Sequence, residues 1–264
     1  MPELAEVEWF RKQWNPGRGD KVLKVELHPA KRIFRETNTR ALRQRLTGEK
    51  FFHSVARGKR MLFNFSGDNW LGLHLGMTGT LRVEAAAFVP AKHDHLVLRQ
   101  RDRALVFRDS RQFGRVRFHH GIDEPDWWRS AVPEIVSPRF DRQFFDRFID
   151  RHHQAPIKAV LLLQAGFSGI GNWMADEILW RAGVRPAKPA GRLTAAEKAA
   201  LFRETRVVAR KSLQTTGETF ADPPRGWLIH ERWRKGGNCP IHRTLLRRAV
   251  IGGRTSAWCS KCQR

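Results

Sequence analysis

The first residues of the chain combine an amine with two carboxylates. Pro2 is followed at once by Glu3 and, three positions further on, by Glu6. If Met1 is removed, Pro2 presents a secondary amine, and an α-amino group titrates near pH ~8, so part of it is unprotonated at neutral pH. Such an amine attacks an aldehyde-like carbon to give an iminium ion, while a carboxylic acid supplies the proton.

The alternative for these residues is an ordinary helix start. Proline is favoured at the first helical position, and acidic residues suit the first turns of a helix. The spacing of Glu3 and Glu6 would place both carboxylates on one face of that helix. Residues 15–17, Asn-Pro-Gly, predict its end.

Metal ligands are concentrated in the last part of the chain. Cys239, Cys259 and Cys262 are its three cysteines, and His242 follows Cys239 at a C-x2-H spacing. Sixteen residues separate the two pairs, which is the length of a hairpin, and Gly252-Gly253 falls mid-span, where a turn favours glycine. Three thiolates and one imidazole suit a closed tetrahedral site, so the pattern predicts one structural zinc ion. The alternative is chance clustering, with His242 unrelated to the cysteines.

Two strand-to-loop segments, residues 74–79 and 109–114, place large side chains beside glycine. They carry Met77, Arg111 and Phe113. Side chains of these kinds push into a base stack and fill the gap after a base leaves. The alternative for Met77 and Phe113 is packing in the core.

A glycine turn at residues 169–172, Gly-Ile-Gly-Asn, opens a predicted helix. Exposed N–H groups at a helix start, together with the Asn172 side chain, are able to hold a phosphate. The alternative is an ordinary turn between two helices.

The composition favours a polyanionic partner. The chain has 264 residues, with 49 lysines and arginines against 26 acidic residues, a net charge of +23 and a pI near 11.3. Nucleic acid is the first partner to expect for such a chain. An anionic membrane surface is disfavoured, because no long apolar run and no amphipathic basic tail is present. The acidic amino terminus lacks an apolar signal segment, so we expect a cytoplasmic protein.

The hydrophobic pattern divides the chain into a strand-rich part and a helical part. Many short alternating segments up to residue 119 predict an antiparallel sandwich or barrel. Proline-bearing, loop-like residues follow, and helices are then predicted to start near Asp141, Pro156 and Asn172, with a capping box at Thr194. The expected divisions are a strand domain at 1–120, a linker at 121–137, a helical domain at 138–235 and a metal hairpin at 236–264.

Together these segments resemble the formamidopyrimidine-DNA glycosylase and endonuclease VIII family of base-excision repair enzymes. The resemblance covers nearly the whole chain, and the order and spacing of the motifs make it specific. Residues 74–79 resemble the formamidopyrimidine-DNA glycosylase branch more closely. The motifs that carry the resemblance are Pro2-Glu3 with Glu6, Arg57-Gly58-Lys59, His74 to Gly79, Lys92 to His95, Arg111 to Gly114, Gly169 to Asn172 with Ala175 and Glu177, and the metal hairpin.

The resemblance implies an α+β fold and a reaction. The fold would be an N-terminal helix on a β-sandwich, followed by a helical helix–two-turn–helix domain with a C-terminal zinc-finger β-hairpin, with double-stranded DNA in a basic cleft between them. The reaction would be that of a bifunctional DNA glycosylase and AP lyase. Such an enzyme, expected here as a monomer, removes oxidised or otherwise damaged bases through a Schiff base and cuts the strand by β,δ-elimination.

The resemblance also assigns roles to residues. Pro2 would be the nucleophile, Glu3 the general acid on the sugar, and Glu6 a support for the opened ring. Lys59 would assist β-elimination, and Arg254 would contact phosphate and take part in δ-elimination. The implied DNA contacts are His74, His93, Lys158 and Asn172, with Met77, Arg111 and Phe113 filling the void; the implied zinc ligands are Cys239, His242, Cys259 and Cys262. For His93 a competing interpretation is metal binding with His95.

The sequence departs from the family pattern in a few places. Ala5 replaces a proline, His242 a cysteine, and Ser110 and Gln112 a proline and an arginine of the wedge loop. Residues 217–238 form a shorter stretch than in the 8-oxoguanine-excising branch, where it closes over the flipped base, so the preferred base stays open. Two other functions also stay open: a catalytically weak relative that binds nicked, abasic or bent DNA, and a zinc-ribbon module fused to an unrelated fold.

Overall fold

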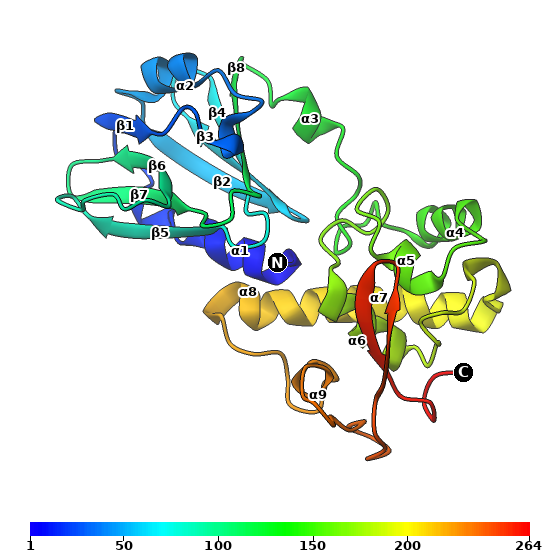
Figure 1. Ribbon diagram of the computed structural model, residues 1–264. Coiled ribbons are helices and arrows are strands. Elements are labelled where there is room, and N and C mark those ends of the chain that lie inside the picture. The colour runs from blue at the N-terminus through cyan, green and yellow to red at the C-terminus, as the bar shows by residue number, and fades with distance from the viewer. The chain divides into compact units, whose positions relative to one another are not determined.

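Eight short strands in the first half of the chain form two antiparallel four-stranded sheets. One sheet has the order β1-β6-β7-β5 and the other β2-β3-β4-β8 (Figure 1). Strands β4, β6 and β7 are buried over most of their length, whereas exposed or half-buried positions alternate with buried ones in β1. The strands are β1 Lys24–Leu27, β2 Phe51–Arg57, β3 Arg60–Phe65, β4 Asn69–His74, β5 Thr80–Ala85, β6 Asp94–Arg99, β7 Arg103–Arg108 and β8 Arg115–His120.

The two sheets share one apolar core. Phe63 of the second sheet and Leu96 and Phe107 of the first are fully buried in the same cluster. Helix α1, Leu4–Lys12, contributes Val7 to it. Burying each such side chain contributes about 1.5–3 kcal/mol, so this layer holds the sheets together. The predicted β-sandwich with an N-terminal helix is confirmed.

Helix α1 begins later than the sequence predicts. Pro2 and Glu3 precede it, so the expectation that Pro2 takes the first helical position is wrong. The backbone N–H of Leu4 donates to the carbonyl of Gly169 at 3.0 Å, which draws the chain end away from a helical start. The other short helices of this half are η1 Asn15–Gly17, η2 Arg32–Phe34, α2 Thr39–Leu46, which is capped by Asn38, and α3 Asp126–Arg129.

Residues 121–131, which the sequence analysis assigns to a linker, pack on the sheet β2-β3-β4-β8. Trp127 fills the space above Gly72, where a Cβ would lie 2.3 Å from the indole ring. Trp128 is fully buried in a small cluster with Leu62 and Trp70. This segment is therefore anchored to the sheet and is not a free connection.

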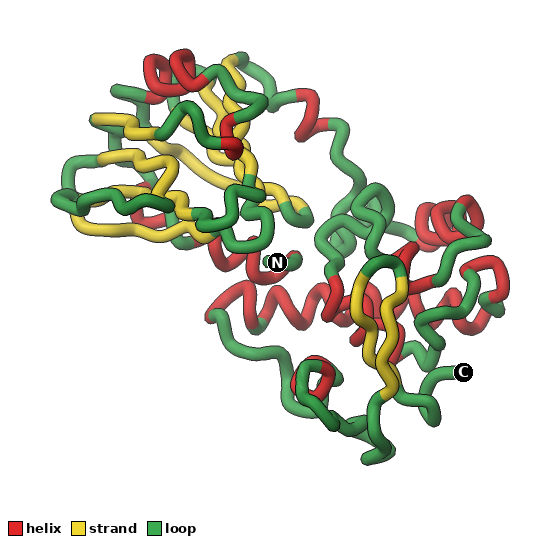
Figure 2. Tube along the Cα trace, viewed as in Figure 1, coloured by secondary structure: helices red, strands yellow, loops and turns green.

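The computed structural model describes residues 1–264 and divides them into two units. The first comprises residues 1–2 and 6–131, and the second residues 3–5 and 132–264. Figure 2 shows strands concentrated in the first unit and helices in the second. Residues 3–5 therefore pack with a unit whose remaining chain comes much later in the sequence.

The second unit is helical and ends in a hairpin. The predicted helix caps are present: the Asp141 carboxylate accepts the N–H of Phe144 at 2.7 Å, and Thr194 and Glu197 form a capping box. A large aromatic and aliphatic cluster fills the space between the helices. The elements are α4 Arg142–Arg151, α5 Ile157–Leu161, α6 Asn172–Arg181, η3 Ala190–Arg192, α7 Ala195–Gln214, α8 Thr216–Thr219, α9 Ile229–Arg232, β9 Arg247–Ile251 and β10 Arg254–Trp258.

The β9–β10 hairpin turns at the predicted glycines. Gly252 and Gly253 have φ values of 60° and 71°, a left-handed conformation that glycine adopts without steric cost. A Cβ on Gly252 would lie 2.8 Å from the Cβ of Ala159, so the turn packs directly on α5. This confirms the predicted α+β fold with a C-terminal hairpin. None of the helices is long and apolar enough to cross a membrane.

Candidate functional site

The carboxylate of Glu3 lies at the N-terminal end of α6. It accepts hydrogen bonds from the N–H groups of Gly171 at 2.9 Å, Trp173 at 3.0 Å and Met174 at 3.2 Å. Glu3 is 3% exposed. Helix starts carry unpaired N–H groups and the positive end of the helix dipole, so they stabilise a negative charge. A Cβ on Gly171 would lie 2.2 Å from the carboxylate carbon, which is why the position requires glycine.

The phosphate cradle predicted at residues 169–172 is therefore filled by a side chain of the protein itself. The prediction that these N–H groups are exposed is wrong for Gly171, which donates to Glu3 together with Trp173 and Met174. The N–H groups of Gly169 and Ile170 donate to Oε1 of Gln164 and to the carbonyl of Phe167. The helix start does bind an anion, but the anion is a carboxylate. The side chain of Asn172 instead faces the hairpin, donating from Nδ2 to the carbonyl of Thr255 at 3.0 Å.

Pro2 and Glu6 lie on either side of this anchored carboxylate in the chain. Pro2 is half-buried and adjoins Met1, which is 50% exposed. Glu6 is half-buried in the first turn of α1. Glu3 and Glu6 do not share a helical face, because Glu3 precedes α1 and its carboxylate is bound by α6.

Lys59 and His74 are neighbours at one end of the sheet β2-β3-β4-β8. Lys59 lies in the turn between β2 and β3 and is 7% exposed, and His74 ends β4. The Nδ1 atom of His74 accepts the N–H of Gly76 at 3.0 Å. Burial, and then the charges of Lys59 and Arg60, lower the pKa of His74 to about 4. His74 is therefore neutral at pH 7.

The two predicted wedge loops meet at a buried carboxylate that the sequence analysis did not single out. Asp109 is fully buried, and its Oδ1 accepts the hydroxyl of Thr78 at 2.7 Å and the N–H of Arg111 at 3.2 Å. Its Oδ2 accepts the N–H of Gly114 at 2.7 Å. One side chain thus fixes both loops to each other. The sequence feature that could have indicated this role of Asp109 is an aspartate that precedes a glycine-bearing loop.

Arg111 and Phe113 are presented on the surface by these loops. The guanidinium of Arg111 lies 4.8 Å from the centre of the Phe113 ring, and Phe113 is 41% exposed. The alternative expected for Phe113, packing in the core, is therefore wrong. Met77 is half-buried on the other loop.

His93 is connected to the same loops through the backbone. Its carbonyl accepts the N–H of Asp109 at 3.0 Å, and its ring is half-buried. His95 is buried, and its Nε2 lies 2.8 Å from the carbonyl of Asp109. The intervening Asp94 pairs with Arg82 at 3.0 Å. These three residues therefore serve separate contacts and do not converge on a metal site.

Lys158, expected to contact phosphate, is completely buried. Its ammonium pairs with Asp176 at 2.5 Å and donates to the carbonyl of Asn172 at 2.7 Å. Burial lowers the pKa of Lys158, and the charge of Asp176 opposes that shift. The structure therefore places Lys158 in the interior of the second unit, and we no longer assign it to phosphate. The role of Asp176 was not predictable from its position, because a charged residue in a helix is typical of a solvated face.

The four predicted metal ligands converge below the β9–β10 hairpin. All four donor atoms lie within 4.8 Å of one another. The Sγ atoms of Cys239 and Cys262 are 3.6 Å apart, and Nδ1 of His242 is 3.8 Å from Sγ of Cys259. Tetrahedral zinc with bonds of about 2.3 Å separates two thiolates by about 3.8 Å, so the cluster fits zinc. The exposed Arg254 lies at the start of β10, next to the turn of this hairpin.

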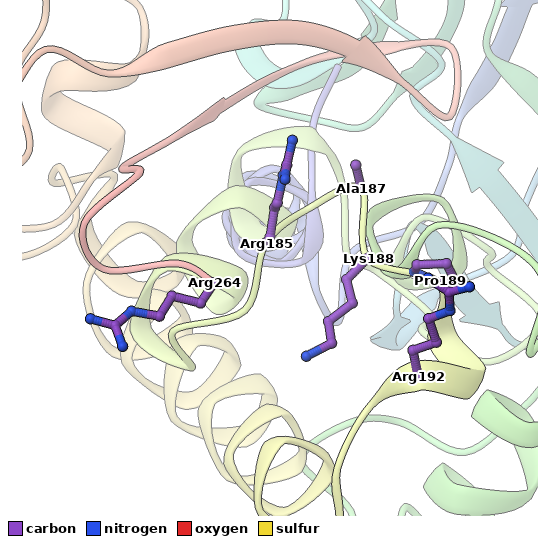
Figure 3. A pocket seen from close by; sticks show the side chains of 6 residues that line it. All are labelled: Arg185, Ala187, Lys188, Pro189, Arg192 and Arg264. Atoms are coloured by element: carbon purple, nitrogen blue, oxygen red, sulfur yellow. The ribbon is translucent and has the colours of Figure 1, made fainter.

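A cationic pocket of about 430 Å³ lies beyond the C-terminal end of α6, away from Glu3. Figure 3 shows that its basic side chains point in different directions. Lys188 is paired with Glu197 at 2.6 Å. The pocket offers no convergent set of donors, so it is not part of the candidate site. Its lining residues are Arg185, Ala187, Lys188, Pro189, Arg192 and Arg264.

Comparisons with known proteins match both units. The family model of the formamidopyrimidine-DNA glycosylase N-terminal domain matches residues 1–116, and that of the formamidopyrimidine-DNA glycosylase H2TH domain matches residues 132–223. The formamidopyrimidine-DNA glycosylase of Thermus thermophilus is 33% identical over 278 residues, covering 100% of this chain and 98% of the relative. The one from Roseiflexus sp. is 32% identical over 274 residues and covers 100% of both chains.

Solved structures of formamidopyrimidine-DNA glycosylases are also similar to this chain over its whole length. A complex of the Lactococcus lactis Fpg protein with DNA containing an oxidised pyrimidine has a TM-score of 0.89 at 26% identity, covering 100% of both chains. A complex of Lactococcus lactis Fpg with DNA containing an abasic site has a TM-score of 0.88 at 26% identity, covering 99% of both chains. The similarity therefore extends over both units and the hairpin.

Proposed function

The chain belongs to the formamidopyrimidine-DNA glycosylase family, and we propose that it is a bifunctional DNA glycosylase and AP lyase of base-excision repair. One observation carries the proposal: Pro2 is followed directly by a carboxylate that three backbone N–H groups of α6 hold in place. A fixed carboxylate beside an amine nucleophile takes up and returns a proton without reorganisation. The net charge of +23 favours duplex DNA as the substrate.

In the proposed reaction Pro2 is the nucleophile. After removal of Met1, the nitrogen lone pair of Pro2 attacks C1′ of the damaged nucleotide. The bond from C1′ to the base breaks, and the base leaves with the bonding electrons and a proton. The ring oxygen then leaves C1′ with a proton from Glu3, which gives an iminium ion between Pro2 and the opened sugar. We assign Glu6 to stabilising the opened sugar.

Two eliminations would then cut the strand. Loss of a C2′ proton from the iminium intermediate expels the 3′ phosphate, and a further proton loss expels the 5′ phosphate. We assign Lys59 to the first elimination, and its place in the β2–β3 turn, next to the end of β4 that carries His74, supports this role. We assign Arg254 to phosphate contact and to the second elimination, because it is exposed beside the hairpin turn. Water finally hydrolyses the imine and frees Pro2.

Further residues would contact the DNA around the flipped nucleotide. We assign Met77, Arg111 and Phe113 to the void left in the duplex, and the exposure of Arg111 and Phe113 supports this role. His74, His93 and Asn172 are assigned to the DNA backbone, as the family motifs imply. Flipping costs a few kcal/mol and costs least for a damaged or mispaired base, so it contributes to selection.

The zinc ion is assigned a structural role. A site closed by three thiolates and one imidazole leaves no position for substrate, so bound zinc holds the hairpin and supplies no reaction step. Removing it with a chelator is expected to weaken DNA binding by releasing Arg254. Metal analysis of refolded protein is expected to return one zinc per chain.

We further propose that the protein acts in the cytoplasm, as a monomer, on nucleoid DNA of the bacterial type. The base that it removes depends on residues 217–238. In this chain the segment holds the end of α8 and the four-residue α9, joined by the residues 220–228. This segment is shorter than in the 8-oxoguanine-excising branch, where it closes over the flipped base. We therefore propose comparing the rate of excision of 8-oxoguanine with that of other damaged bases.

Borohydride trapping tests the proposal. Protein with Pro2 verified as the first residue is mixed with duplexes that carry an oxidised purine, an oxidised pyrimidine or an abasic site, and is then reduced. Wild type is expected to form the covalent cross-link, and Pro2→Gly is expected to form far less of it. The control Glu8→Gln is expected to cross-link to the same extent as wild type. Glu3→Gln is expected to lose base excision and keep some cleavage of a preformed abasic site. Tight binding by wild type without trapping on any duplex would replace the proposal with structure-specific DNA binding.

A further inference from the structure

The buried side chain of Asp176 touches three separate parts of the second unit. Its Oδ1 pairs with Lys158 of α5 at 2.5 Å. Its Oδ2 accepts from Nε of Arg232, the last residue of α9, at 3.0 Å, and from the N–H of Ala257 on β10 at 3.2 Å. Asp176 itself belongs to α6 and is fully buried. One carboxylate thus joins helices α5 and α6, the end of α9 and the hairpin.

The hairpin is fixed to α5 and α6 at more than one position. The carbonyl of Thr255 accepts from Nδ2 of Asn172 at 3.0 Å and from Nη2 of Arg232 at 3.3 Å. On the other side of the turn, Gly252 packs against Ala159. Arg254 lies between Gly252 and Thr255. The contacts of these two residues therefore fix the position of the Arg254 backbone, from which its side chain extends.

The buried charges of Asp176, Lys158 and Arg232 restrict how these side chains are arranged. Two cations, Lys158 and Arg232, share one carboxylate in a place where none of the three is more than 3% exposed. Charge-assisted hydrogen bonds are strong in such surroundings, and a displaced partner leaves a buried charge unpaired. Arg232 is also packed under Trp233, whose ring centre lies 3.8 Å from the guanidinium. These constraints favour one position of the hairpin over others.

We propose that Asp176 and Arg232 are positioning residues for Arg254. They do not touch DNA; they hold β10 against α6 so that the Arg254 guanidinium reaches the 5′ phosphate during the second elimination. Because Arg232 ends α9, the same contact ties residues 217–232 to the hairpin, so that the two segments move together. The inference rests on the proposed function, in which Arg254 acts in δ-elimination.

The substitution Arg232→Met tests the proposal with the least damage to the fold. It removes one of two cations and leaves Lys158 and Asp176 as a matched pair. The matched control is Arg234→Met, which removes the same charge from an exposed side chain that pairs only with Glu231 in this segment. The substrate is a duplex with a preformed abasic site, on which the ratio of β,δ- to β-elimination product is measured.

Arg232→Met is expected to shift the product ratio about tenfold toward the β-elimination product, because it loses charge-assisted hydrogen bonds. Arg254→Ala is expected to shift the ratio in the same direction. Arg234→Met is expected to leave the ratio unchanged. In the Arg254→Ala background, Arg232→Met is expected to change the ratio no further, because both act through one side chain. Arg232→Lys, which keeps the charge but loses the fork geometry, is expected to lie between wild type and Arg232→Met.

Two results would overturn the proposal: a slower reaction with an unchanged product ratio, and additive effects of Arg232→Met and Arg254→Ala. Hydrogen exchange of the β9 and β10 amides gives a readout that does not need activity. Exchange is expected to be about tenfold faster in Arg232→Met than in Arg234→Met, and equal rates would contradict the network. If wild type fails to cleave, the proposed function fails, while the exchange result still decides the inference.

Discussion

Two buried carboxylates hold the segments expected to meet DNA, and they do so with different partners. Asp109 in the first unit accepts from neutral groups, namely the Thr78 hydroxyl and two backbone N–H groups. Asp176 in the second unit is paired with an ammonium and a guanidinium. A hydrogen bond from a neutral donor to a carboxylate contributes about 1.5–3 kcal/mol, whereas breaking a buried ion pair costs about 3–5 kcal/mol. The two sites should therefore respond very differently to substitution.

The difference also concerns what each site controls. Asp109 fixes two loops whose exposed side chains are assigned to the void in the duplex. Asp176 fixes the hairpin that carries Arg254. Damage at Asp109 should therefore appear first as lost lesion recognition, and damage at Asp176 first as lost stability of the second unit.

The largest effect is expected for Asp176→Ala. It leaves Lys158 and Arg232 buried without a counter-charge, and should lower the free energy of unfolding by about 3–5 kcal/mol. Urea unfolding measures this, with Asp150→Ala as control, since Asp150 lies in an exposed ion pair with Lys198 and should change stability by less than about 0.5 kcal/mol. A loss for Asp176→Ala no larger than that for Asp150→Ala would show that the buried ion pairs of Asp176 do not stabilise the second unit.

A smaller effect is expected for Asp109→Ala. It leaves neutral donors unpaired and should cost about 1–3 kcal/mol, with Asp109→Asn costing less because one oxygen acceptor remains. Affinity for an abasic duplex should fall more than affinity for an undamaged one, and Arg111→Ala and Phe113→Ala should do the same. Equal loss on both duplexes would count against the wedge assignment.

Salt dependence distinguishes the exposed cation from the buried one. Arg254→Ala should reduce the slope of log affinity against log salt by about 0.9, which corresponds to one phosphate contact. Lys158→Met should leave the slope unchanged, because its ammonium is buried in the pair with Asp176. A flatter slope for Lys158→Met would return Lys158 to the phosphate role that its sequence position implied.

A further effect concerns pH and His74. Its pKa of about 4, against an ordinary 6.5, means that the folded state binds fewer protons than the unfolded state between these values. Its contribution to stability is therefore complete above pH 6.5 and is lost as the pH falls toward 4. The stability difference between wild type and His74→Gln should shrink over this range. A constant difference would show that His74 does not titrate there.

Local spacing made part of this molecule predictable. The four metal ligands follow from two short motifs, and the helix caps at Asp141 and Thr194 follow from neighbouring residues. Glu3 could not be placed, because the N–H groups that it binds begin 168 positions away. Lys158 was misplaced for the same reason, since Arg232, which shares its carboxylate, lies 56 positions beyond Asp176.

The segment 121–131 shows a second limit of the sequence. Its proline, Pro125, and its polar residues are typical of a linker, and two adjacent tryptophans gave no indication of a partner. The partner of Trp127 is Gly72, because the indole ring occupies the space that a Cβ on Gly72 would take. A complementarity between a large residue and a glycine far away in the chain leaves no periodic pattern to detect.

Glu3 and its hydrogen-bond donors leave the ribosome well apart in time. Gly171 follows Glu3 by 168 positions, which at 5–20 residues per second corresponds to roughly 10–30 s of translation. Until α6 has been synthesised, these donors are absent and residues 3–5 cannot join the second unit. The proposed reaction requires removal of Met1, and the late anchoring of Glu3 leaves that interval for it.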